Sequence, residues 1–314
     1  MRKKQRVIVT GGAGFIGSHI ARRLLAQGYK VAVIDNLSTG KEENIPKEAE
    51  FIKLDLGKNS SYEAINGISC DAIFHLAGQS SGEASFKDPY YDFCSHALST
   101  FRLLEYAKRK KVARFMYASS MSVYGDPCYL PVNEAHPLNP RSFYAAAKIS
   151  AEGYIKLYQS LGMNTTIFRM FSVYGPGQNL ENKMQGMLSI YLSYFLEKTP
   201  VVIKGSEERF RDFVYIDDVV EAWFKSLEEP ISYGKIYNLA SGEKTKVKYL
   251  ISSLKKYFKT ADYTVKHEEG TPGDQFGVVA DISLIKKELA WEPKIGLKAG
   301  IRKTIDFQLE KIGK

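Results

Sequence analysis

The sequence predicts an α/β protein built on a doubly wound parallel sheet and followed by a smaller C-terminal domain. Short runs of β-branched and aromatic residues alternate with helical patterns over the first half of the chain, and these runs are apolar almost throughout. Strand–helix alternation is typical of doubly wound domains, and unbroken apolar strands are expected where helices cover both faces of a parallel sheet. After about residue 172 the rhythm changes to turn-rich, polar sequence, which indicates the second domain.

The individual elements follow from residue type and spacing. Runs rich in Val, Ile and Phe predict strands, at 6–10, 30–35, 51–55, 72–77, 114–119 and 164–170. Apolar residues three and four apart predict helices, at 15–27, 90–111 and 143–161. We expect residues 1–172 with 213–240 to form the larger domain, and residues 173–212 with 241–314 to form the smaller one.

The composition excludes several classes of protein. The chain has 314 residues, 44% of them apolar, which is enough for one large core or for two domains that share an interface. Its formal net charge of +9 is spread along the chain, and the densest run, KRKK at 108–111, ends a predicted helix, where positive charge is favourable. We therefore expect no nucleic-acid partner. No apolar stretch has membrane-spanning length, so we expect no membrane partner either.

The cysteines and histidines indicate neither a disulfide framework nor a metal site. Cys70, Cys94 and Cys128 are widely spaced and odd in number, and the five histidines are scattered along the chain. This usage fits a reducing, cytoplasmic protein. We expect no metal ligands.

A glycine-rich segment, TGGAGFIG, follows the first predicted strand and opens the first predicted helix. Gly11, Gly14 and Gly17 permit a tight turn, close approach of the backbone to a pyrophosphate, and close helix–sheet packing. The second strand ends in Asp35, whose carboxylate can accept hydrogen bonds from ribose hydroxyls and would repel a 2′-phosphate. Asn36 follows, where NADP-binding proteins often carry Arg. The pattern predicts a Rossmann-type domain that binds NAD rather than NADP.

Two further polar groups leave alternatives open. Asp55 ends the third strand, where it fits a contact with the adenine amino group and, equally well, a plain helix cap. Ser119, Ser120 and Ser122 follow the fifth strand. They fit a bond to a substrate oxygen at the carboxyl edge of the sheet, or ordinary turn chemistry.

The segment SFYAAAK places Tyr144 and Lys148 one helical turn apart, since alanine strongly favours the helix. By itself, such a pair is most often a tyrosine packed on a lysine stem at the surface. The other interpretation is catalytic. A cation about 5 Å away, at an effective dielectric constant of about 20, contributes about 3 kcal/mol. That interaction would lower the phenol pKa by roughly two units from its usual value of about 10.

Six segments together resemble a known family: TGGAGFIG, HLAG, SSMSVYG, YAAAK, FSVYGPGQ and RDFVYIDDV. Their order is similar to that of extended short-chain dehydrogenases/reductases in the NAD-dependent epimerase/dehydratase family, with the UDP-galactose (UDP-glucose) 4-epimerases as the nearest likeness. The resemblance covers essentially the whole chain. It implies an NAD-dependent enzyme of carbohydrate metabolism whose smaller domain binds a nucleoside-diphosphate sugar.

The resemblance also implies roles for the matching residues. Tyr144 would be the acid/base, Lys148 would bond the nicotinamide ribose, and Ser120 would assist Tyr144. The residues implied in cofactor binding are Gly11, Gly14, Phe15, Ile16, Gly17, Asp35, Asn36, Asp55, Leu56, Leu76, Ala77, Gly78, Tyr144 and Lys148. Those implied in substrate binding are Ser80, Ser120, Met121, Tyr144, Ser172, Arg211 and Val278. The implied reaction is 4-epimerisation, in which the sugar is oxidised transiently at C4 and hydride returns to its opposite face.

Several positions depart from the family pattern. Dehydratases carry an acidic pair after the catalytic Ser or Thr, whereas this chain has Met121 and Ser122, so dehydration is disfavoured. Ser172 stands where relatives have Asn and Thr271 where they have Arg, which weakens one clamp on the nucleotide diphosphate, although Arg211 is retained to bond phosphate oxygens.

Two more departures concern the pocket itself. His96 stands in place of an Asn with a structural and water-holding role in the family, so that role is in doubt here. A gapless count from Gly273 and Asp274 places Val278 where a Tyr restricts the sugar pocket of some relatives. A smaller residue there would admit an N-acetyl group or a longer sugar.

Other functions remain as alternatives. A nucleotide-sugar 4-dehydrogenase or 4-keto reductase would release its product, and accumulation of NADH would separate it from an epimerase. A non-catalytic NAD-binding regulator or an RNA-binding protein could dispense with Tyr144, Lys148 and Ser120, all of which this chain retains. The resemblance also implies a homodimer formed through the helices at 90–111 and 143–161.

Overall fold

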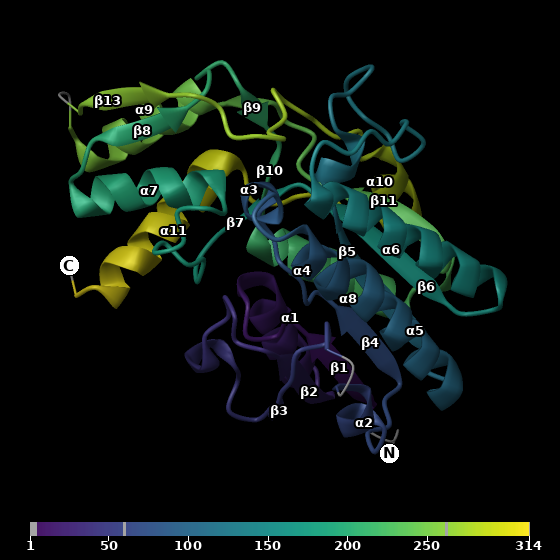
Figure 1. Ribbon diagram of the computed structural model, residues 1–314. Helices are drawn as coiled ribbons and strands as arrows, with labels where there is room; N and C mark the ends of the chain where they lie inside the picture. The colour runs from purple at the N-terminus through teal and green to yellow at the C-terminus, as the bar shows by residue number, and fades with distance from the viewer. Residues whose placement is uncertain (1–4, 59–60, 261–262, 314) are drawn as a thin grey trace.

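The computed structural model describes residues 5–58, 61–260 and 263–313. Within these residues, seven strands form one parallel sheet in the larger lobe, in the order β11-β6-β5-β4-β1-β2-β3 (Figure 1). The strands are β1 (Arg6–Thr10), β2 (Lys30–Asp35), β3 (Glu50–Lys53), β4 (Ala72–His75), β5 (Arg114–Ser120), β6 (Thr165–Met170) and β11 (Lys235–Leu239). The order reverses beside β1, which lies between β2 and β4. Ligands of such sheets bind at this reversal, beyond the carboxyl ends of the strands.

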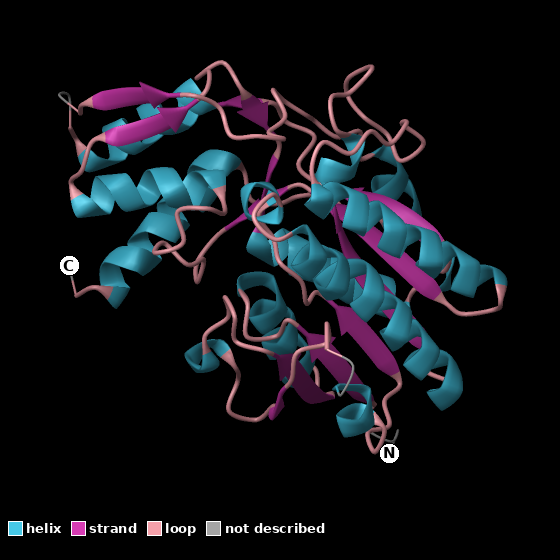
Figure 2. Cartoon of the chain, viewed as in Figure 1, coloured by secondary structure: helices cyan, strands magenta, loops and turns pink. Residues whose placement is uncertain are grey.

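Helices cover both faces of the sheet, which confirms the predicted fold class (Figure 2). The helices of this lobe are α1 (Phe15–Ala26), α2 (Ser61–Ile65), α3 (Gly82–Ser85), α4 (Pro89–Phe93), α5 (Ser99–Lys110), α6 (Phe143–Ser160) and α8 (Ile216–Glu228). Successive strand residues face opposite cores: Val7 packs in the same cluster as Trp223 of α8, whereas Ile8 packs with Leu104 of α5. Two separate apolar layers therefore explain why the strands are apolar throughout.

The smaller lobe carries three two-stranded sheets among the described residues. They pair β7 (Ser172–Tyr174) with β10 (Phe213–Tyr215), β9 (Phe210–Arg211) with β12 (Thr245–Lys246), and β8 (Val201–Lys204) with β13 (Val265–Glu268). The remaining helices are α7 (Met187–Glu197), α9 (Val247–Phe258), α10 (Ser283–Leu289) and α11 (Leu297–Lys311). Short 3-10 turns lie at Glu42–Asn44, Met121–Tyr124 and Pro230–Ser232.

Part of the C-terminal segment, around α10, contacts the larger lobe. Glu288 of α10 accepts hydrogen bonds from Lys235 and Tyr237 of β11, at 2.6 Å each. Trp291 donates to the backbone carbonyl of Asp218 in α8, at 2.9 Å. Residues around α10 thus lie against the larger lobe, although they fall inside the range 241–314 that was expected to belong to the smaller domain.

The strands and the helices at 15–27 and 143–161 lie where the sequence predicts them, apart from small shifts at their ends. The segment 90–111 differs, because a π-helical turn at Cys94–Leu98 separates α4 from α5. A π-turn inserts an extra residue into the helix and is frequent at functional sites. Among the residues that the structure describes, no helix is both long and apolar enough to cross a membrane.

Candidate active site

The glycine-rich segment forms a turn that brings the backbone of α1 against the carboxyl edge of the sheet. Gly11 has a left-handed φ of +70°, and a Cβ there would lie 2.7 Å from the amide nitrogen of Ala77. A Cβ on Gly17 would lie 2.2 Å from the carbonyl oxygen of Gly11. Gly14 begins α1 as its N-cap and offers no side chain to the free N–H groups of the first turn. The N-terminus of α1 is therefore open to an anionic ligand.

The ends of β2 and β3 supply carboxylates beside this turn. Asp35 is buried and accepts hydrogen bonds from the backbone N–H of Ala13 (3.0 Å) and of Leu37 (2.8 Å). Burial raises the pKa of Asp35, and its backbone hydrogen bonds oppose that rise. Asp55 accepts from the N–H of Gly57 at 2.9 Å, as a turn-forming carboxylate does. This hydrogen bond is consistent with a structural role for Asp55. A contact between Asp55 and the adenine amino group would be compatible with it.

The segment after β4 is held in place by one threonine. Thr10 Oγ1 accepts hydrogen bonds from the N–H groups of Leu76 (3.2 Å) and Ala77 (3.1 Å), and contacts His75 Nδ1 at 2.7 Å. His75 is fully buried, and burial lowers its pKa to about 3, so it is neutral at physiological pH. The HLAG segment, residues 75–78, is thus held in a fixed position beside the glycine turn.

All the residues implied in cofactor binding line one cavity, which we call the glycine-loop cavity. They are Gly11, Gly14, Phe15, Ile16, Gly17, Asp35, Asn36, Asp55, Leu56, Leu76, Ala77, Gly78, Tyr144 and Lys148. They come from the ends of β1 to β4 and from α1 and α6. A single cavity at the switch point of the sheet is where a dinucleotide is expected.

Tyr144 and Lys148 lie in the first two turns of α6. Ser142 caps this helix, accepting the N–H of Ala145 at 3.1 Å, which fixes where the helix begins. Lys148 is buried, and its Nζ donates to the carbonyl oxygen of Ala118 at 2.7 Å. The same Nζ lies 5.7 Å from the centre of the Tyr144 ring. The predicted helical pair therefore faces inward, toward the carboxyl end of β5.

The electrostatics of this pair differ from the sequence-based expectation. Burial raises the pKa of Tyr144 to about 12, although a hydrogen bond with Ser120 opposes the rise. Burial also lowers the pKa of Lys148 to about 7. The expected lowering of the phenol pKa by Lys148 is thus not found in the chain alone, because both groups have lost their hydration and the ammonium charge is itself destabilised.

Ser120 lies at the end of β5 and caps the 3-10 turn that follows. Its Oγ accepts the N–H of Ser122 at 3.2 Å and donates to Ser122 Oγ at 3.1 Å. Its interaction with Tyr144 brings the two hydroxyl groups together. Ser119, one residue earlier, donates its hydroxyl proton to Glu152 at 2.6 Å. Ser120 is accordingly the serine of this segment that can assist Tyr144.

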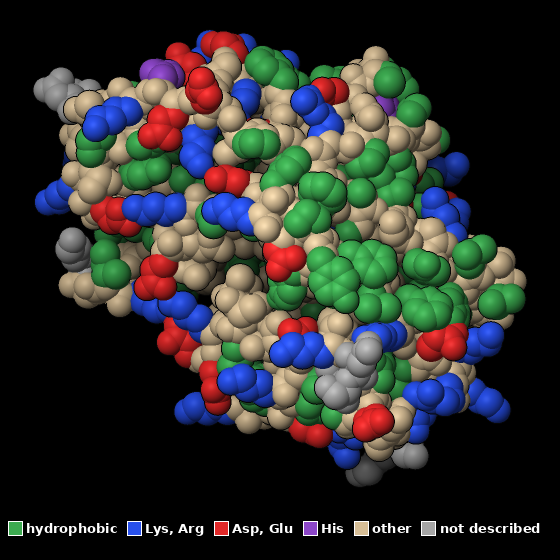
Figure 3. All heavy atoms as spheres, viewed as in Figure 1, with side chains coloured by type: hydrophobic (Ala, Val, Ile, Leu, Met, Phe, Trp, Pro, Cys, Tyr) green, Lys and Arg blue, Asp and Glu red, His purple; other side chains and the backbone are tan. Residues whose placement is uncertain are grey.

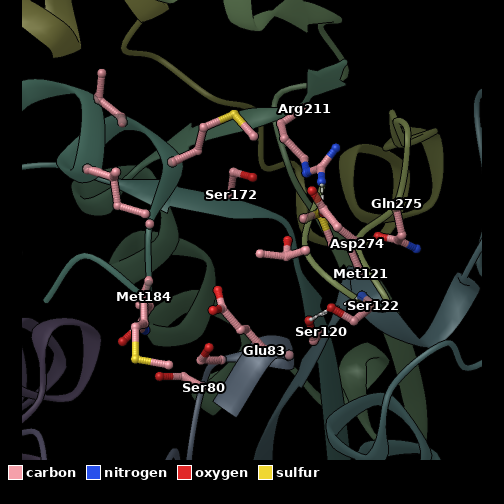
Figure 4. Close-up of a pocket in the computed structure, with 18 of the residues that line it drawn as sticks. Ser80, Glu83, Ser120, Met121, Ser122, Ser172, Met184, Arg211, Asp274 and Gln275 are labelled. Carbon is pink, nitrogen blue, oxygen red and sulfur yellow. Dashed lines mark hydrogen bonds and ion pairs between the residues drawn. The ribbon is translucent and has the colours of Figure 1, made fainter. Parts of the chain in front are cut away.

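A second cavity, which we call the Arg211 cavity, opens between the two lobes (Figure 4). Arg211 Nη2 forms an ion pair with Asp274, and Arg209 Nη1 pairs with the other oxygen of the same carboxylate. Ser80 and Glu83 lie across the pocket from Arg211. Two arginines share one carboxylate, so this wall of the cavity keeps a net positive charge that suits phosphate oxygens.

The implied substrate residues fall into two groups. Ser80, Ser120, Met121, Tyr144, Ser172 and Arg211 all line the Arg211 cavity. Val278 does not: its side chain is fully buried in the apolar core. The expectation that it borders the sugar fails because the chain enters the core after the exposed Phe276, whereas Gln275 still lines the cavity. Thr271 lines the cavity as well.

Two residues that line the Arg211 cavity, Arg209 and Glu83, were not predicted from the sequence. Arg209 lies two residues before Arg211, so the alternation of a strand would have placed both on one face. Glu83 pairs with Lys204 of β8 at 3.3 Å, which links the two lobes across the cavity. Neither position belongs to a recognisable motif, and only the folded chain brings them together.

His96 packs against Tyr144, a contact that the sequence did not predict. Its Nε2 lies 2.7 Å from the carbonyl oxygen of Gln79, and its ring meets the Tyr144 ring edge-on, with centroids 5.2 Å apart. Because a carbonyl only accepts, Nε2 carries the proton and Nδ1 is bare. Burial holds the pKa of His96 well below its ordinary value, so this ring is neutral. It packs behind Tyr144.

Comparisons with known proteins identify the relatives of this chain. The sequence model described as the NAD dependent epimerase/dehydratase family matches residues 7–240. A UDP-glucose 4-epimerase of Mycolicibacterium smegmatis is 33% identical over 96% of this chain and 98% of its own length. UDP-glucuronic acid decarboxylase 1 of Arabidopsis thaliana is 32% identical over 98% of this chain and 71% of its own. The crystal structure of a Thermus thermophilus UDP-glucose 4-epimerase in complex with NAD superposes with a TM-score of 0.89, at 35% identity, covering 96% of this chain and 98% of that one.

Proposed function

The chain belongs to the NAD-dependent epimerase/dehydratase family, and we propose that within it the protein is a nucleotide-sugar 4-epimerase. One observation carries the proposal: Tyr144 lines both the glycine-loop cavity and the Arg211 cavity. A group that removes the hydroxyl proton must reach the alcohol while the C–H bond faces the hydride acceptor, so it should border both the substrate site and the cofactor site. Tyr144 is a candidate for that position, with Ser120 beside its hydroxyl and Lys148 one turn behind it.

NAD is the cofactor of this family, and the glycine-loop cavity fits it. The uncapped N-terminus of α1 suits a diphosphate, and the carboxylate of Asp35 suits ribose hydroxyls while opposing a 2′-phosphate. Bound there, NAD would accept a hydride from the sugar C4 and return it. We assign Lys148 to the nicotinamide ribose, since its buried ammonium lines the same cavity as the glycine turn.

Tyr144 is assigned as the acid/base, and Ser120 as the donor that orients the sugar 4-hydroxyl. The Tyr144 phenolate would take the hydroxyl proton as C4 is oxidised, and would give it back when the ketone is reduced. Because the pKa of Tyr144 is about 12 in the chain alone, the phenolate needs stabilisation beyond what Lys148 supplies. We therefore expect proton transfer to depend on the positive charge of the oxidised cofactor.

Epimerisation is favoured over elimination of water by the side chains after Ser120. Met121 and Ser122 line the Arg211 cavity, and neither can protonate a leaving hydroxyl at neutral pH. Inversion also requires the 4-keto sugar to turn over while its diphosphate stays bound. Arg211 and Arg209, held by Asp274, provide a fixed anchor at a distance from the reacting carbon.

The experiment is incubation with UDP-, GDP-, CDP- and dTDP-sugars, uronates included, with products resolved by NMR. We expect inversion at C4 of a UDP-sugar, with no net change in NADH absorbance. Release of a keto sugar with stoichiometric NADH would instead identify a 4-dehydrogenase, and release of carbon dioxide from a UDP-uronate would identify a decarboxylase. Salt-sensitive RNA binding without any turnover would support a binding protein.

Replacing Arg211 by Met is expected to raise the KM for the nucleotide sugar about 10- to 100-fold, since a charge-assisted hydrogen bond to phosphate contributes about 1.5–3 kcal/mol. Asp274 keeps Arg209 as its partner, so no unpaired carboxylate results. Steady-state kinetics measure KM and kcat separately. Arg302→Met, on an exposed residue outside both cavities, is the matched control. An unchanged KM in Arg211→Met would contradict the assignment.

We also propose that the protein is a homodimer formed through α5 and α6. Apolar side chains gather on this face of the molecule, where the green surface in Figure 3 overlies the helices of Figure 1. They are Phe93, Phe101, Tyr154, Leu157 and Leu161, exposed by 37 to 67%. Contiguous apolar surface of this kind typically marks an interface.

Leu157→Glu is expected to convert the dimer into a monomer, because it places a charge on that apolar face. Light scattering coupled to gel filtration measures the mass in solution. Ile312→Glu introduces the same charge at an exposed apolar residue of the C-terminal segment and should leave the dimer intact. A wild-type mass equal to one chain would refute the proposal.

A further inference from the structure

Asp92 is a buried carboxylate that the proposed reaction leaves without a role. It lies in α4, its side chain is only 1% exposed, and it comes from no motif of the sequence. The Nε2 of Gln79 donates to its two oxygens at 3.4 and 3.3 Å, both long for a hydrogen bond. A buried charge of this kind requires compensation by another charge.

His96 does not provide that compensation. Its Nε2 lies 3.5 Å from Asp92 Oδ1, but the proton on Nε2 points to the carbonyl oxygen of Gln79, at 2.7 Å. Burial and the nearby Lys148 hold the pKa of His96 well below its ordinary value. His96 is therefore a neutral ring between Asp92 and Tyr144.

Lys148 is the cation that this carboxylate faces. The ammonium lies 5.7 Å from the centre of the Tyr144 ring, which packs on the His96 ring beside Asp92, so these two rings connect the two charged groups. Among the described residues, no carboxylate oxygen lies within 4.0 Å of Lys148 Nζ, and the carbonyl of Ala118 is its short contact. Lys148 thus carries a buried charge without a direct ion pair.

The other titratable groups around Lys148 do not replace Asp92. Those that interact with it or with its ring neighbours are Asp92 of α4, His96 of the π-turn, His75 of β4, Tyr117 of β5, and Tyr144 and Glu152 of α6. Burial keeps both histidines and both tyrosines neutral. Glu152 is already paired with Arg169 at 2.8 Å. Asp92 is the carboxylate of this group without a cationic partner among the described residues.

We propose that Asp92 is a positioning residue that keeps the Lys148 ammonium charged, acting electrostatically across His96 and the Tyr144 ring. The inference takes from the proposed function only the roles of Tyr144 and Lys148. Removing Asp92 would leave the buried ammonium with only Glu152, which is already paired with Arg169. Lys148 would then lose its proton at lower pH, and the cation behind the phenolate would be lost with it.

The charge states support this arrangement. Burial lowers the pKa of Lys148 to about 7, and Asp92 is the strongest influence raising it again. Burial raises the pKa of Asp92 to about 6, against a hydrogen bond from Gln79 and the positive charge of Lys148. Asp92 gains a proton as the pH falls through its raised pKa, and Lys148 loses its proton as the pH rises through its lowered pKa.

The test is an NMR titration of Lys148 in protein labelled with ¹³C-lysine, with its ¹³Cε signal assigned by its absence in Lys148→Arg. We expect a midpoint near 7 in the wild-type chain. In Asp92→Asn the midpoint should fall by about one unit or more, and Asp92→Glu should restore most of it. Asp218→Asn is the matched control: Asp218 is also a buried carboxylate, but it accepts N–H groups of Lys294 and Ile295.

A midpoint in Asp92→Asn within about 0.3 unit of wild type, or equal to that of Asp218→Asn, would overturn the proposal. If Asp92→Asn does not fold, the reciprocal measurement decides: Lys148→Met should raise the titration midpoint of the Asp92 carboxyl above that of wild type, since coupling acts equally on both partners. No change there would overturn it equally. Neither titration needs a substrate, so failure of the proposed reaction would be seen separately. In an active enzyme, Asp92→Asn should move the alkaline limb of the kcat profile to lower pH.

Discussion

Replacing Tyr144 by Phe is expected to reduce turnover of the nucleotide sugar by about 10²- to 10⁴-fold, the usual contribution of a general acid/base. Phe keeps the ring that packs on His96 but removes the hydroxyl beside Ser120. Affinity for NAD should change little, because the glycine turn and Asp35 are untouched. Single-turnover kinetics and fluorescence titration with NADH measure the two quantities independently.

The control for this variant lies on the same helix. Tyr158→Phe also removes one buried phenol hydroxyl from α6, in this case one bonded to Glu105. It should retain wild-type turnover because Tyr158 lines neither cavity. If Tyr144→Phe kept its activity, the assignment of the acid/base would be wrong. If both variants lost activity together, the effect would be structural.

Arg169→Met is expected to destabilise the fold by about 3–5 kcal/mol, since it leaves a buried carboxylate without its partner. Arg169 of β6 donates to Glu152 from Nε (3.0 Å) and Nη2 (2.8 Å), and to the Glu134 carbonyl oxygen from Nη1 (2.9 Å). Both members of the pair are almost fully buried. Urea denaturation of the variant, followed by far-UV circular dichroism, measures the loss.

A double variant separates the charge from the packing. Arg169→Met combined with Glu152→Gln should recover part of the lost stability, because neither member of this pair then leaves the other as an unpaired charge. Arg6→Met, which removes the exposed partner of Glu50, should cost less than about 1 kcal/mol. A loss in Arg169→Met as small as in Arg6→Met would contradict the expectation.

Local patterns predicted the fold and the framework of the site. The turn at Gly11 to Gly17 and the helical spacing of Tyr144 and Lys148 depend on backbone geometry, which short segments determine. The carboxyl edge of a parallel sheet then collects residues from separate strands, which is why Asp35 and Gly78 line the same cavity.

Features that depend on the packed interior could not be predicted in this way. The sign of the pKa change at Tyr144 depends on how far burial outweighs the charge of Lys148, and residue spacing says nothing about burial. The shared partner of Arg209 and Arg211, Asp274, lies more than sixty residues away along the chain. Val278 was wrongly expected to line the cavity. Counting residues without gaps from Gly273 and Asp274 assumes that the backbone follows the same path as in the relatives.

One face of α6 sends a polar side chain inward at three consecutive turns: Tyr144, Lys148 and Glu152. The axial rotation of this helix is therefore determined by polar partners on β5 and β6, which tolerate little displacement. A rotation by one residue would push three polar groups into hydrocarbon at once. Replacing a buried aliphatic residue of α6 such as Ile155 by a smaller one should accordingly lower the free energy of unfolding. The orientation of the Tyr144 ring should not change.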